Sequence, residues 1–398
     1  MLKNQTYDVV IIGAGPSGAT LARLLDSKYS ILLIDARNLT TDFENIKQSQ
    51  DIQAKCCGGL LAPDAQTWLN KFNLIVPEKV KDIYQPEFVN TIDLSTHSVH
   101  SYKKNYINLD RTLFETWLLS LLPENVQCLF NSRLHGLKHF NTNDHFTQLS
   151  IKTPAGIQEI KTRIVVGADG AFSAVRRMLG KGISQKDCYL AIQDKYKVLG
   201  YSDKNLTKTH WAAFDESLTD FYGWAIPKKD SYLVGLALPL DASKNILATK
   251  LLEQKDVKNN DKTSNSLAHR KLNIFTQRLI EQGLTLSSIE YDKVEREGAL
   301  VVRPSLNQVY LGRDNCFLIG EAAGFISPSS AEGFSYAFAS AFYLAEVFNK
   351  TFDPIKAEQS YRRKIFSLKA NIAWKNLKGI GMYNQTLRNM ALKVGLGF

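Results

Sequence analysis

The stretch YDVVIIGAGPSGATLARLL, residues 7–25, decides the fold. Its first part, Tyr7–Ile12, is apolar apart from Asp8, and such a run is typical of a strand buried on both faces of a parallel sheet. A glycine-rich turn at 13–18 and an apolar pattern at helical spacing follow. A second apolar run, 31–34, ends at Asp35. The pattern predicts a β–α–β unit with parallel strands and a right-handed crossover.

The glycine-rich turn has the spacing of a dinucleotide-binding loop. Gly13 is expected to make the tight turn, Gly15 to let a pyrophosphate approach the backbone, and Gly18 to let the helix pack on the strand. The helix start offers unpaired N–H groups and a partial positive charge to phosphates. Asp35 follows Gly13 by 22 residues, close to the roughly 20-residue spacing of a ribose-binding carboxylate. The predicted nucleotide contacts are Gly13, Ala14, Gly15, Pro16, Ser17, Gly18, Asp35, Ala36 and Arg37.

The composition excludes several classes of protein. Of the 398 residues, 44% are hydrophobic and 10% aromatic, which excludes an intrinsically disordered chain. The length suits two domains or one large interleaved body. Five cysteines leave at least one thiol unpaired, as expected in a reducing cytoplasm. Because we find neither a long uncharged apolar run nor a signal-peptide pattern, we expect a cytoplasmic protein without a transmembrane helix.

Two later segments are predicted to return to the same sheet. Residues 163–166 are predicted to be a short strand that ends in the sequence GADG at 167–170, and residues 316–319 another that ends in GEAAG at 320–324. A site for NAD alone needs one fingerprint, whereas FAD also has a ribityl chain and a ring to hold. A carboxylate at a strand end, such as that of Glu321, can accept hydrogen bonds from ribityl hydroxyls. We therefore predict FAD.

A helical pattern at 331–348 follows, with Gly333 in its first turn. The start of this helix would stabilise the negative charge that develops at the pyrimidine end of a flavin on reduction. The small residues around 320–324 have an alternative interpretation, a glycine- and alanine-rich seam between packed helices.

The fold class predicted from these segments is α/β. Stretches such as 211–214 and 232–238 alternate like antiparallel strands with one solvated face, and the polar stretch 255–271 is expected to be a surface excursion. We predict a Rossmann-like FAD-binding domain, an inserted antiparallel-sheet substrate domain and a C-terminal helical tail. The predicted domains are a discontinuous FAD-binding domain at 1–75, 105–180 and 296–350, a substrate or cap domain at 76–104 and 181–295, and a basic helical region at 351–398.

These motifs resemble the flavoprotein family that contains p-hydroxybenzoate hydroxylase, geranylgeranyl reductases and flavin-dependent halogenases. Residues 167–176 resemble its DG motif, and 320–321 resemble its GD motif with Glu in place of the usual Asp. The segment YINLDR at 106–111 resembles an arginine element that implies a contact of Arg111 with the flavin phosphate or ribityl region; a salt bridge at a helix start is the alternative. The resemblance implies cofactor contacts at Arg111, Leu134, Asp169, Gly170, Gly320, Glu321, Gly324, Gly333 and Phe334.

Two further motifs resemble the geranylgeranyl reductase branch. The sequence KCCGG at 55–59 resembles an element placed beside the isoalloxazine ring, which adds Cys57, Gly58 and Gly59 to the cofactor residues. Cys57 is the candidate catalytic residue. Three roles stay open for it: a proton donor, a redox or covalent contact with the flavin, and a small buried thiol.

The sequence YGWAIP at 222–227 resembles the reductases' YxWxFP motif, which lines a cavity for an extended isoprenoid. Residues two apart in a strand share one face, so Tyr222 and Trp224 would make a rigid apolar wall with polar edges. The predicted substrate residues are Tyr222, Trp224 and Pro227, and core packing is the alternative for the aromatic pair.

The resemblance implies an FAD-dependent oxidoreductase that reduces carbon–carbon double bonds in an isoprenoid or lipidic substrate by hydride transfer from flavin N5. The runner-up is an FAD-dependent monooxygenase acting on an aromatic or apolar molecule. We rank a hydroxylase above a halogenase because the first Trp of the halogenase WxWxIP motif is missing and Lys55, the nearest candidate for a catalytic lysine, sits in the cysteine element. A third hypothesis is a non-catalytic flavoprotein that binds a partner or a lipid carrier.

Metal and electron-donor signals are weak. The seven histidines lack ligand spacing with cysteines or acids, so we predict no metal site. NAD(P)H remains open as electron donor because a second dinucleotide fingerprint is missing, and related flavoproteins accept hydride without one.

The net charge of +10 is concentrated near the C-terminus. No acidic residue follows Glu358, and eight Lys or Arg residues lie in 361–398 among apolar residues. A basic amphipathic helix suits an anionic membrane surface, and a terminal helix packed on the core with a solvated basic face is the alternative. Since a nucleic-acid recognition motif is missing, we expect no nucleic acid partner.

Overall fold

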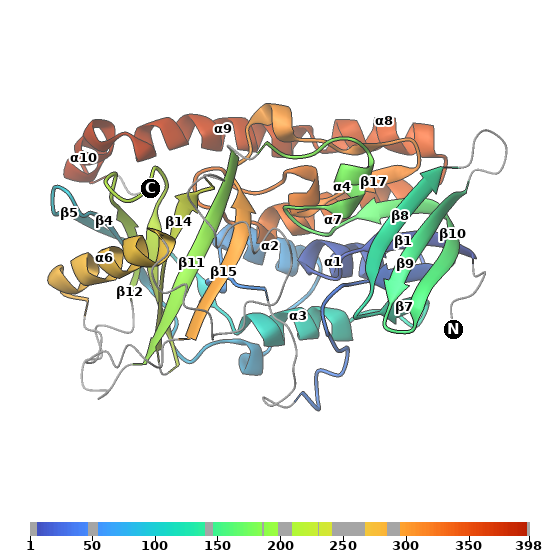
Figure 1. Cartoon of the computed structure of the whole chain (residues 1–398), viewed down its shortest axis with the longest axis horizontal. Coiled ribbons are helices and arrows are strands. Elements are labelled where there is room, and N and C mark those ends of the chain that lie inside the picture. The colour runs from blue at the N-terminus through green and yellow to red at the C-terminus, as the bar shows by residue number, and fades with distance from the viewer. Residues whose placement is uncertain are drawn as a thin grey trace.

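The computed structural model describes residues 6–46, 55–139, 146–184, 187–197, 209–229, 231–240, 267–284 and 295–395. Two large sheets lie at opposite ends of an elongated molecule, and helices α8, α9 and α10 run along one edge across both (Figure 1). Among the described residues, no helix is long and apolar enough to cross a membrane.

The first sheet has eight strands and is mainly parallel. Its central order is β16-β17-β10-β1-β2-β7, and β8 and β9 extend β10 as an antiparallel hairpin arrangement. Its strands are β1 (Thr6–Ile12), β2 (Ile31–Ile34), β7 (Val126–Leu129), β8 (Arg133–His139), β9 (Thr147–Thr153), β10 (Gly156–Gly167), β16 (Gly312–Arg313) and β17 (Cys316–Leu318).

Three parallel strands of this sheet end side by side. β1 and β10 are in register at Ile12 and Gly167, and β10 and β17 at Gly167 and Leu318. The glycine-containing segments that follow therefore meet at one edge of the sheet, as the sequence predicted. Carboxyl ends of parallel strands are where open α/β sheets bind their ligands.

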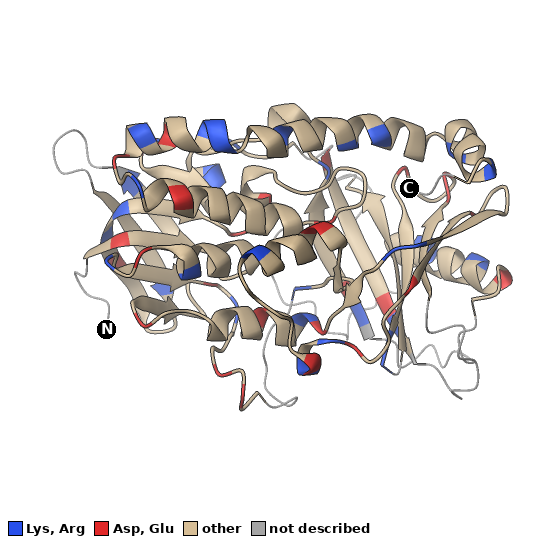
Figure 2. Cartoon of the chain, turned by 180° about the vertical axis from the view of Figure 1, so that it is seen from behind, with Lys and Arg blue, Asp and Glu red and all other residues tan. Residues whose placement is uncertain are grey.

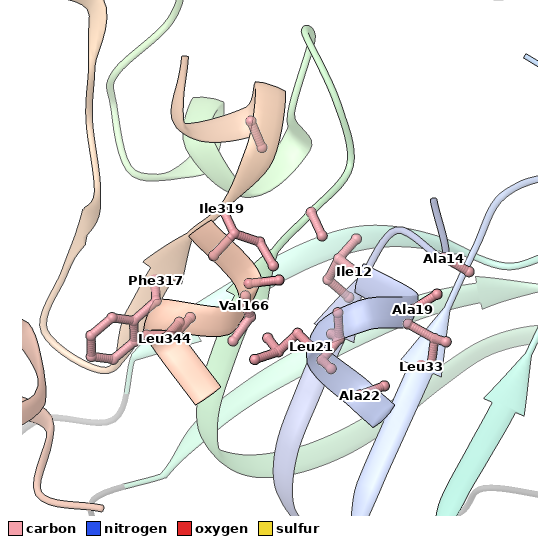
Figure 3. Packing of buried hydrophobic residues seen from close by; sticks show 14 of the residues in the cluster. Ile12, Ala14, Ala19, Leu21, Ala22, Leu33, Val166, Phe317, Ile319 and Leu344 are labelled. Atoms are coloured by element: carbon pink, nitrogen blue, oxygen red, sulfur yellow. The ribbon is translucent and has the colours of Figure 1, made fainter. Parts of the chain in front are cut away.

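Helices cover this sheet and complete its core. Buried Ile12, Leu33 and Val166 of the strands lie with Leu21 of α1 and Leu344 of α7 (Figure 3). The continuous apolar runs of the strands are explained by this coverage. The helices of this half are α1 (Pro16–Leu24), α2 (Pro63–Lys71), α3 (Arg111–Ser120), α4 (Ala174–Met178) and α7 (Phe334–Phe348).

The second sheet has seven strands in the order β15-β11-β14-β13-β12-β4-β5. All of its neighbouring strands are antiparallel except β12 and β4, which are parallel. Helix α6 (Leu267–Glu281) covers one face with Leu272, Phe275 and Leu279. The strands are β4 (Phe88–Asp93), β5 (Ser98–Lys103), β11 (Cys188–Lys197), β12 (Thr209–Phe214), β13 (Gly223–Lys228), β14 (Ser231–Pro239) and β15 (Glu295–Val302).

Two details of the predicted organisation differ from this structure. Residues 267–271 were expected to belong to a polar surface excursion. They form the N-terminal part of α6 instead, because Ala268 and His269 are buried there. The rest of that excursion, 255–266, lies outside the described residues. β15 pairs with β11, so the second sheet continues to Val302, past the boundary predicted between 295 and 296.

The remaining elements connect and cover the two sheets. A two-stranded sheet of β3 (Leu60–Leu61) and β6 (Ile107–Asn108) brings the cysteine element beside the segment that precedes Arg111. Short helical turns are η1 (Glu78–Val80), η6 (Leu306–Gln308) and η7 (Gly320–Ala323), and the C-terminal helices are α8 (Pro354–Lys364), α9 (Phe366–Tyr383) and α10 (Gln385–Lys393).

Candidate cofactor and active site

The loop after β1 is shaped by three glycines with different surroundings. At Gly13, where φ is +106°, an added Cβ would lie 2.4 Å from the carbonyl oxygen of Ala168. At Gly18 it would lie 1.9 Å from the carbonyl oxygen of Gly13. At Gly15 it would meet nothing within 4 Å. Gly13 and Gly18 are therefore needed for packing, whereas Gly15 borders open space at the start of α1, where unpaired N–H groups can bind an anion.

Asp35, predicted to bind ribose, is hydrogen-bonded to the glycine-rich loop after β1 and to Arg37. Its buried carboxylate accepts a 2.8 Å hydrogen bond from the backbone N–H of Ala14, and 2.8 and 3.0 Å bonds from the backbone and Nε of Arg37. Ala36 is exposed. Leu134 packs in the core just beyond Ser132, whose N–H donates to the carbonyl of Asp35. These nucleotide contacts stay predictions, but the residues lie together.

A chain of buried charges runs from this loop toward the cysteine element. Arg37 donates to Glu115 at 2.6 Å, and Arg111 donates to the other Glu115 oxygen at 3.0 and 2.5 Å. Burial alone would raise the pKa of Glu115, but the charges of Arg111 and Arg37 hold that pKa below its ordinary value. Glu115, which sequence analysis did not single out, orients both arginines.

Arg111 also reaches the candidate catalytic thiol. One of its terminal nitrogens lies 3.8 Å from Sγ of Cys57, and its guanidinium carbon lies 4.6 Å from the centre of the Phe334 ring. Arg111 makes the salt bridge at the start of α3 that was the alternative interpretation. It also lies beside two predicted cofactor residues, and its contact with the flavin stays a prediction.

Two carboxylates of the predicted cofactor motifs, Asp169 in 167–170 and Glu321 in 320–324, each have one oxygen without a hydrogen-bond partner in the described structure. Oδ2 of Asp169 accepts a hydrogen bond from the N–H of Ala174 at 2.6 Å, and Oε2 of Glu321 accepts one from Nζ of Lys55 at 2.8 Å. Oδ1 of Asp169 and Oε1 of Glu321 are buried without a hydrogen-bond partner in the described structure. Burial raises the pKa of Asp169. Because buried acceptors are almost always satisfied, the two oxygens fit a bound ligand that carries hydroxyl groups.

The glycines of 320–324 serve helix packing as well. At Gly320, where φ is +55°, an added Cβ would lie 2.8 Å from Oγ of Ser17, and the Gly320 N–H donates to Oγ of Ser340 at 2.9 Å. At Gly324 it would lie 2.9 Å from the carbonyl oxygen of Gln308. Helix α7 starts beyond its N-cap Gly333, where an added Cβ would meet only Ile326 at 3.9 Å. The segment thus packs η7 against α1 and α7, and the N-terminus of α7 has room beside it.

The cysteine element lies against the end of β13. An added Cβ at Gly58 would come within 2.4 Å of Cδ1 of Ile226. At Gly59, where φ is +70°, it would lie 2.5 Å from the carbonyl oxygen of Leu109 and 2.8 Å from Nζ of Lys228. Cys56 and Cys57 are free thiols, and burial raises the pKa of Cys56 well above its ordinary value. The two reductase-like motifs are therefore in direct contact.

The Tyr222 and Trp224 rings lie on one face of the second sheet with centroids 6.0 Å apart, as the strand period predicts. The Tyr222 hydroxyl donates to the carbonyl of Ser330 at 2.7 Å, and Nε1 of Trp224 donates to Oε1 of Gln193 at 3.1 Å. Pro227 is buried, and its carbonyl accepts a hydrogen bond from Asn108. The Tyr222–Trp224 wall has the expected polar edges, and other groups of the protein already form hydrogen bonds with both of these edges.

Two groups missed by sequence analysis belong to the same region. Lys228 donates to Oδ1 of Asn108 at 2.5 Å and to the carbonyl of Leu109 at 2.9 Å, and burial lowers its pKa to about 8. Glu332, just before Gly333, accepts a 2.6 Å hydrogen bond from the Tyr106 hydroxyl. Lys228 directly follows the YGWAIP motif, and this position in the sequence was the signal that could have identified Lys228 as a site residue.

Comparisons with known proteins place these features in a family. The profile described as lycopene cyclase protein matches residues 8–382. The chain belongs to this lycopene cyclase protein family. Protein CbrA of Escherichia coli O6:H1 is 31% identical over 392 residues, which cover 98% of this chain and 94% of CbrA.

Solved structures show the fold of this lycopene cyclase family protein. A geranylgeranyl bacteriochlorophyll reductase-like protein of Thermoplasma acidophilum has a TM-score of 0.73 at 16% identity, covering 98% of this chain and 91% of that chain. A Klebsiella pneumoniae HpxO variant complexed with FAD has a TM-score of 0.63 at 14% identity, covering 98% and 94%. The predicted fold of FAD-dependent oxidoreductases is confirmed, and the likeness to geranylgeranyl reductases is one of fold.

Proposed function

We propose that this protein binds FAD and acts as an FAD-dependent oxidoreductase. One observation carries the proposal: Oδ1 of Asp169 and Oε1 of Glu321 are buried carboxylate oxygens that lack a hydrogen-bond partner in the described structure. They follow strands that end beside the turn of Gly15, the open glycine. An extended ligand with a pyrophosphate and hydroxyl groups satisfies all three positions.

Each part of the site has a role in this proposal. The N-terminus of α1 holds the pyrophosphate, and the region of Asp35 holds the ribose. Asp169 and Glu321 accept hydrogen bonds from ribityl hydroxyls. The ring region is bordered by the cysteine element and Phe334, where Arg111 lies between Cys57 and the aromatic ring.

We propose further that the substrate is an isoprenoid or similar lipid and that a carbon–carbon double bond is reduced. When bound and reduced by an electron donor such as NAD(P)H, the flavin would supply the hydride from its N5 position. The family description names lycopene, a polyene isoprenoid, and one fold relative is described as geranylgeranyl reductase-like. Tyr222, Trp224 and Ile226 provide an aromatic and aliphatic surface that excludes water. Cys57, or the Tyr106 hydroxyl that Glu332 holds, supplies the proton that completes the reduction.

A variant at Gly15 tests cofactor binding without disturbing the fold. Because an added Cβ at Gly15 meets nothing within 4 Å, Gly15→Leu should fold but obstruct the phosphate site. Purified wild type should carry flavin or take up added FAD, and the variant should not. Gly182→Leu, at a glycine whose added Cβ also meets nothing within 4 Å, is the matched control and should retain FAD. Folded wild-type protein that refuses FAD would overturn the proposal.

The reaction is tested with FAD-loaded protein and a panel of geranylgeranyl lipids. Under anaerobic dithionite, mass spectrometry should show a gain of two hydrogens for each reduced bond, and parallel assays with NADPH and NADH identify the physiological reductant. Unchanged lipids throughout the panel would contradict the reductase assignment. Gain of an oxygen atom in air with NADPH would favour the monooxygenase instead.

A further inference from the structure

The C-terminal helices expose apolar side chains in a row. On α9 the row consists of Phe366, Ala370, Trp374, Leu377 and Ile380, whose spacings of three and four residues place them on one helix face. Phe366 is 72% exposed, Trp374 63% and Ile380 64%. On α10 and its C-cap residue the row continues with Leu387, Met390 and Val394, which are 47%, 61% and 72% exposed. We call these eight residues the apolar row.

The opposite face of α9 is already used for packing. Ile372, Gly379 and Met382 are buried, and the Tyr383 hydroxyl donates to the carbonyl of Ser329 at 2.7 Å. The guanidinium of Arg303 lies 4.3 Å from the centre of the Tyr383 ring. The apolar row is therefore a second apolar face, beyond what folding of this chain needs, and large exposed apolar patches mark interaction sites.

Positive charge accompanies the apolar row. Figure 2 shows Lys and Arg spaced along α8 and α9, and no acidic residue follows Glu358. Arg388 does not add to this surface charge, because its side chain is 1% exposed and donates to Asp93 at 2.6 and 2.9 Å. Other basic residues of this region are intermediate or exposed: Arg362, Arg363, Lys364, Lys369, Lys375, Lys378 and Lys393.

We propose that the apolar row and its flanking lysines and arginines dock on the surface of an anionic lipid bilayer. An exposed amphipathic face with Trp, Phe and Leu on one side and basic residues beside it is the composition of helices that lie in a membrane interface. Association with a second copy through the same face would bring two positively charged surfaces together, and like charges across an interface are repulsive. The charge thus selects an anionic lipid surface over self-association.

The location of the face fits a lipid substrate. Helix α9 contacts the loop 327–332 through Tyr383, and that loop precedes Gly333 and the start of α7. The hydroxyl of Tyr222, which precedes β13 of the second sheet, donates a hydrogen bond to the carbonyl of Ser330 in the same loop. Docking of α9 would therefore place the loop between the candidate site and the bilayer. The docking itself does not depend on the proposed reaction.

Vesicle co-sedimentation of the full chain tests the docking. The wild type should sediment with vesicles of phosphatidylcholine and phosphatidylglycerol in equal amounts, much less with phosphatidylcholine alone, and less as salt is raised. Trp374→Glu with Leu377→Glu should weaken binding at least roughly tenfold. Lys369→Gln and Lys393→Gln should each weaken it by about fivefold.

Ile157→Glu is the matched control, since Ile157 is 57% exposed and belongs to β10 of the first sheet, not to the C-terminal helices. It should bind vesicles like the wild type. All variants should keep the wild-type circular dichroism spectrum and FAD content, which separates this test from that of the proposed function. Equal sedimentation of wild type and the Trp374/Leu377 variant would overturn the proposal, as would a dimer by analytical ultracentrifugation that this variant abolishes while vesicles stay unbound.

Discussion

Nζ of Lys55 lies 2.8 Å from Oε2 of Glu321, joining the cysteine element to the end of β17 across 266 residues of sequence. The charge of Glu321 raises the pKa of Lys55. Glu321 stands where the flavoprotein motif has the shorter Asp. Its extra methylene lets one oxygen pair with Lys55 while the other stays without a partner in the described structure. The substitution thus adds a tie between two parts of the site and retains an acceptor for a ligand.

Lys55→Met should lower the free energy of unfolding by about 1 kcal/mol, because the pair is partly exposed and solvent screens it. Urea unfolding of the protein without FAD measures the loss. Lys81→Met is the control, since Lys81 pairs with the exposed Glu78 and should cost close to nothing. If both variants lose the same amount, the Lys55–Glu321 pair is an ordinary surface ion pair.

The buried ion pair of Arg388 anchors the C-terminal helices more strongly than an exposed ion pair of the same helices does. Its side chain is 1% exposed and pairs with Asp93, which is fully buried. Removing one partner of a buried pair leaves an uncompensated charge, so Arg388→Met should cost about 3–5 kcal/mol. Arg362→Met removes a pair with the more exposed Glu358 and should cost below about 1 kcal/mol.

The double variant Arg388→Met with Asp93→Asn gives the second half of this test. It should recover much of the loss, because no fully buried charge is then left unpaired; Glu216, the second carboxylate near Arg388, is 45% exposed to solvent. Equal stability of Arg388→Met and Arg362→Met in urea would show that the tail is not anchored by this pair.

The nucleotide half was predictable because its signals are local. A buried strand, a glycine turn and a helix follow one another within residues 7–25, and backbone geometry alone demands glycine at 13 and 18. The convergence of 167–170 and 320–324 was predictable as well, since each follows a short apolar strand.

The remaining site could not be predicted because its contacts join residues far apart in sequence. Arg388 looked like one more basic residue of a solvated or membrane-bound tail, and only the tertiary structure shows that Asp93 neutralises it. The pairing of Lys55 with Glu321 and the approach of Lys228 to Gly59 likewise depend on how β17 and β13 meet the cysteine element. The sequence separates these groups by more than a hundred residues.

Lys228 should make stability depend on pH in the alkaline range. Burial lowers its pKa in the folded protein to about 8, below the ordinary value of 10.5. Between these two values the unfolded chain binds the proton that the folded protein has lost, so the contribution of Lys228 to the free energy of unfolding rises as pH increases. Lys228→Met should flatten this rise, which urea titrations between about pH 7 and pH 11 would measure. Lys229→Met, at the exposed neighbour, should leave the wild-type slope, and an unchanged slope in Lys228→Met would refute the assignment.

Gly59 should tolerate substitution less well than Gly58, although both belong to the cysteine element. At Gly59 an added Cβ meets the backbone oxygen of Leu109 at 2.5 Å, and φ of +70° strains any side chain. At Gly58 it meets only the end of the Ile226 side chain, which can rotate. Gly59→Ala should therefore cost at least about 1–3 kcal/mol and move the cysteine element, and Gly58→Ala should cost less. Thermal unfolding ranks the two variants, and the accessibility of Cys57 to a thiol reagent reports the movement. A Gly58→Ala variant less stable than Gly59→Ala would mean that the cysteine element rests on β13 rather than on the backbone before Arg111.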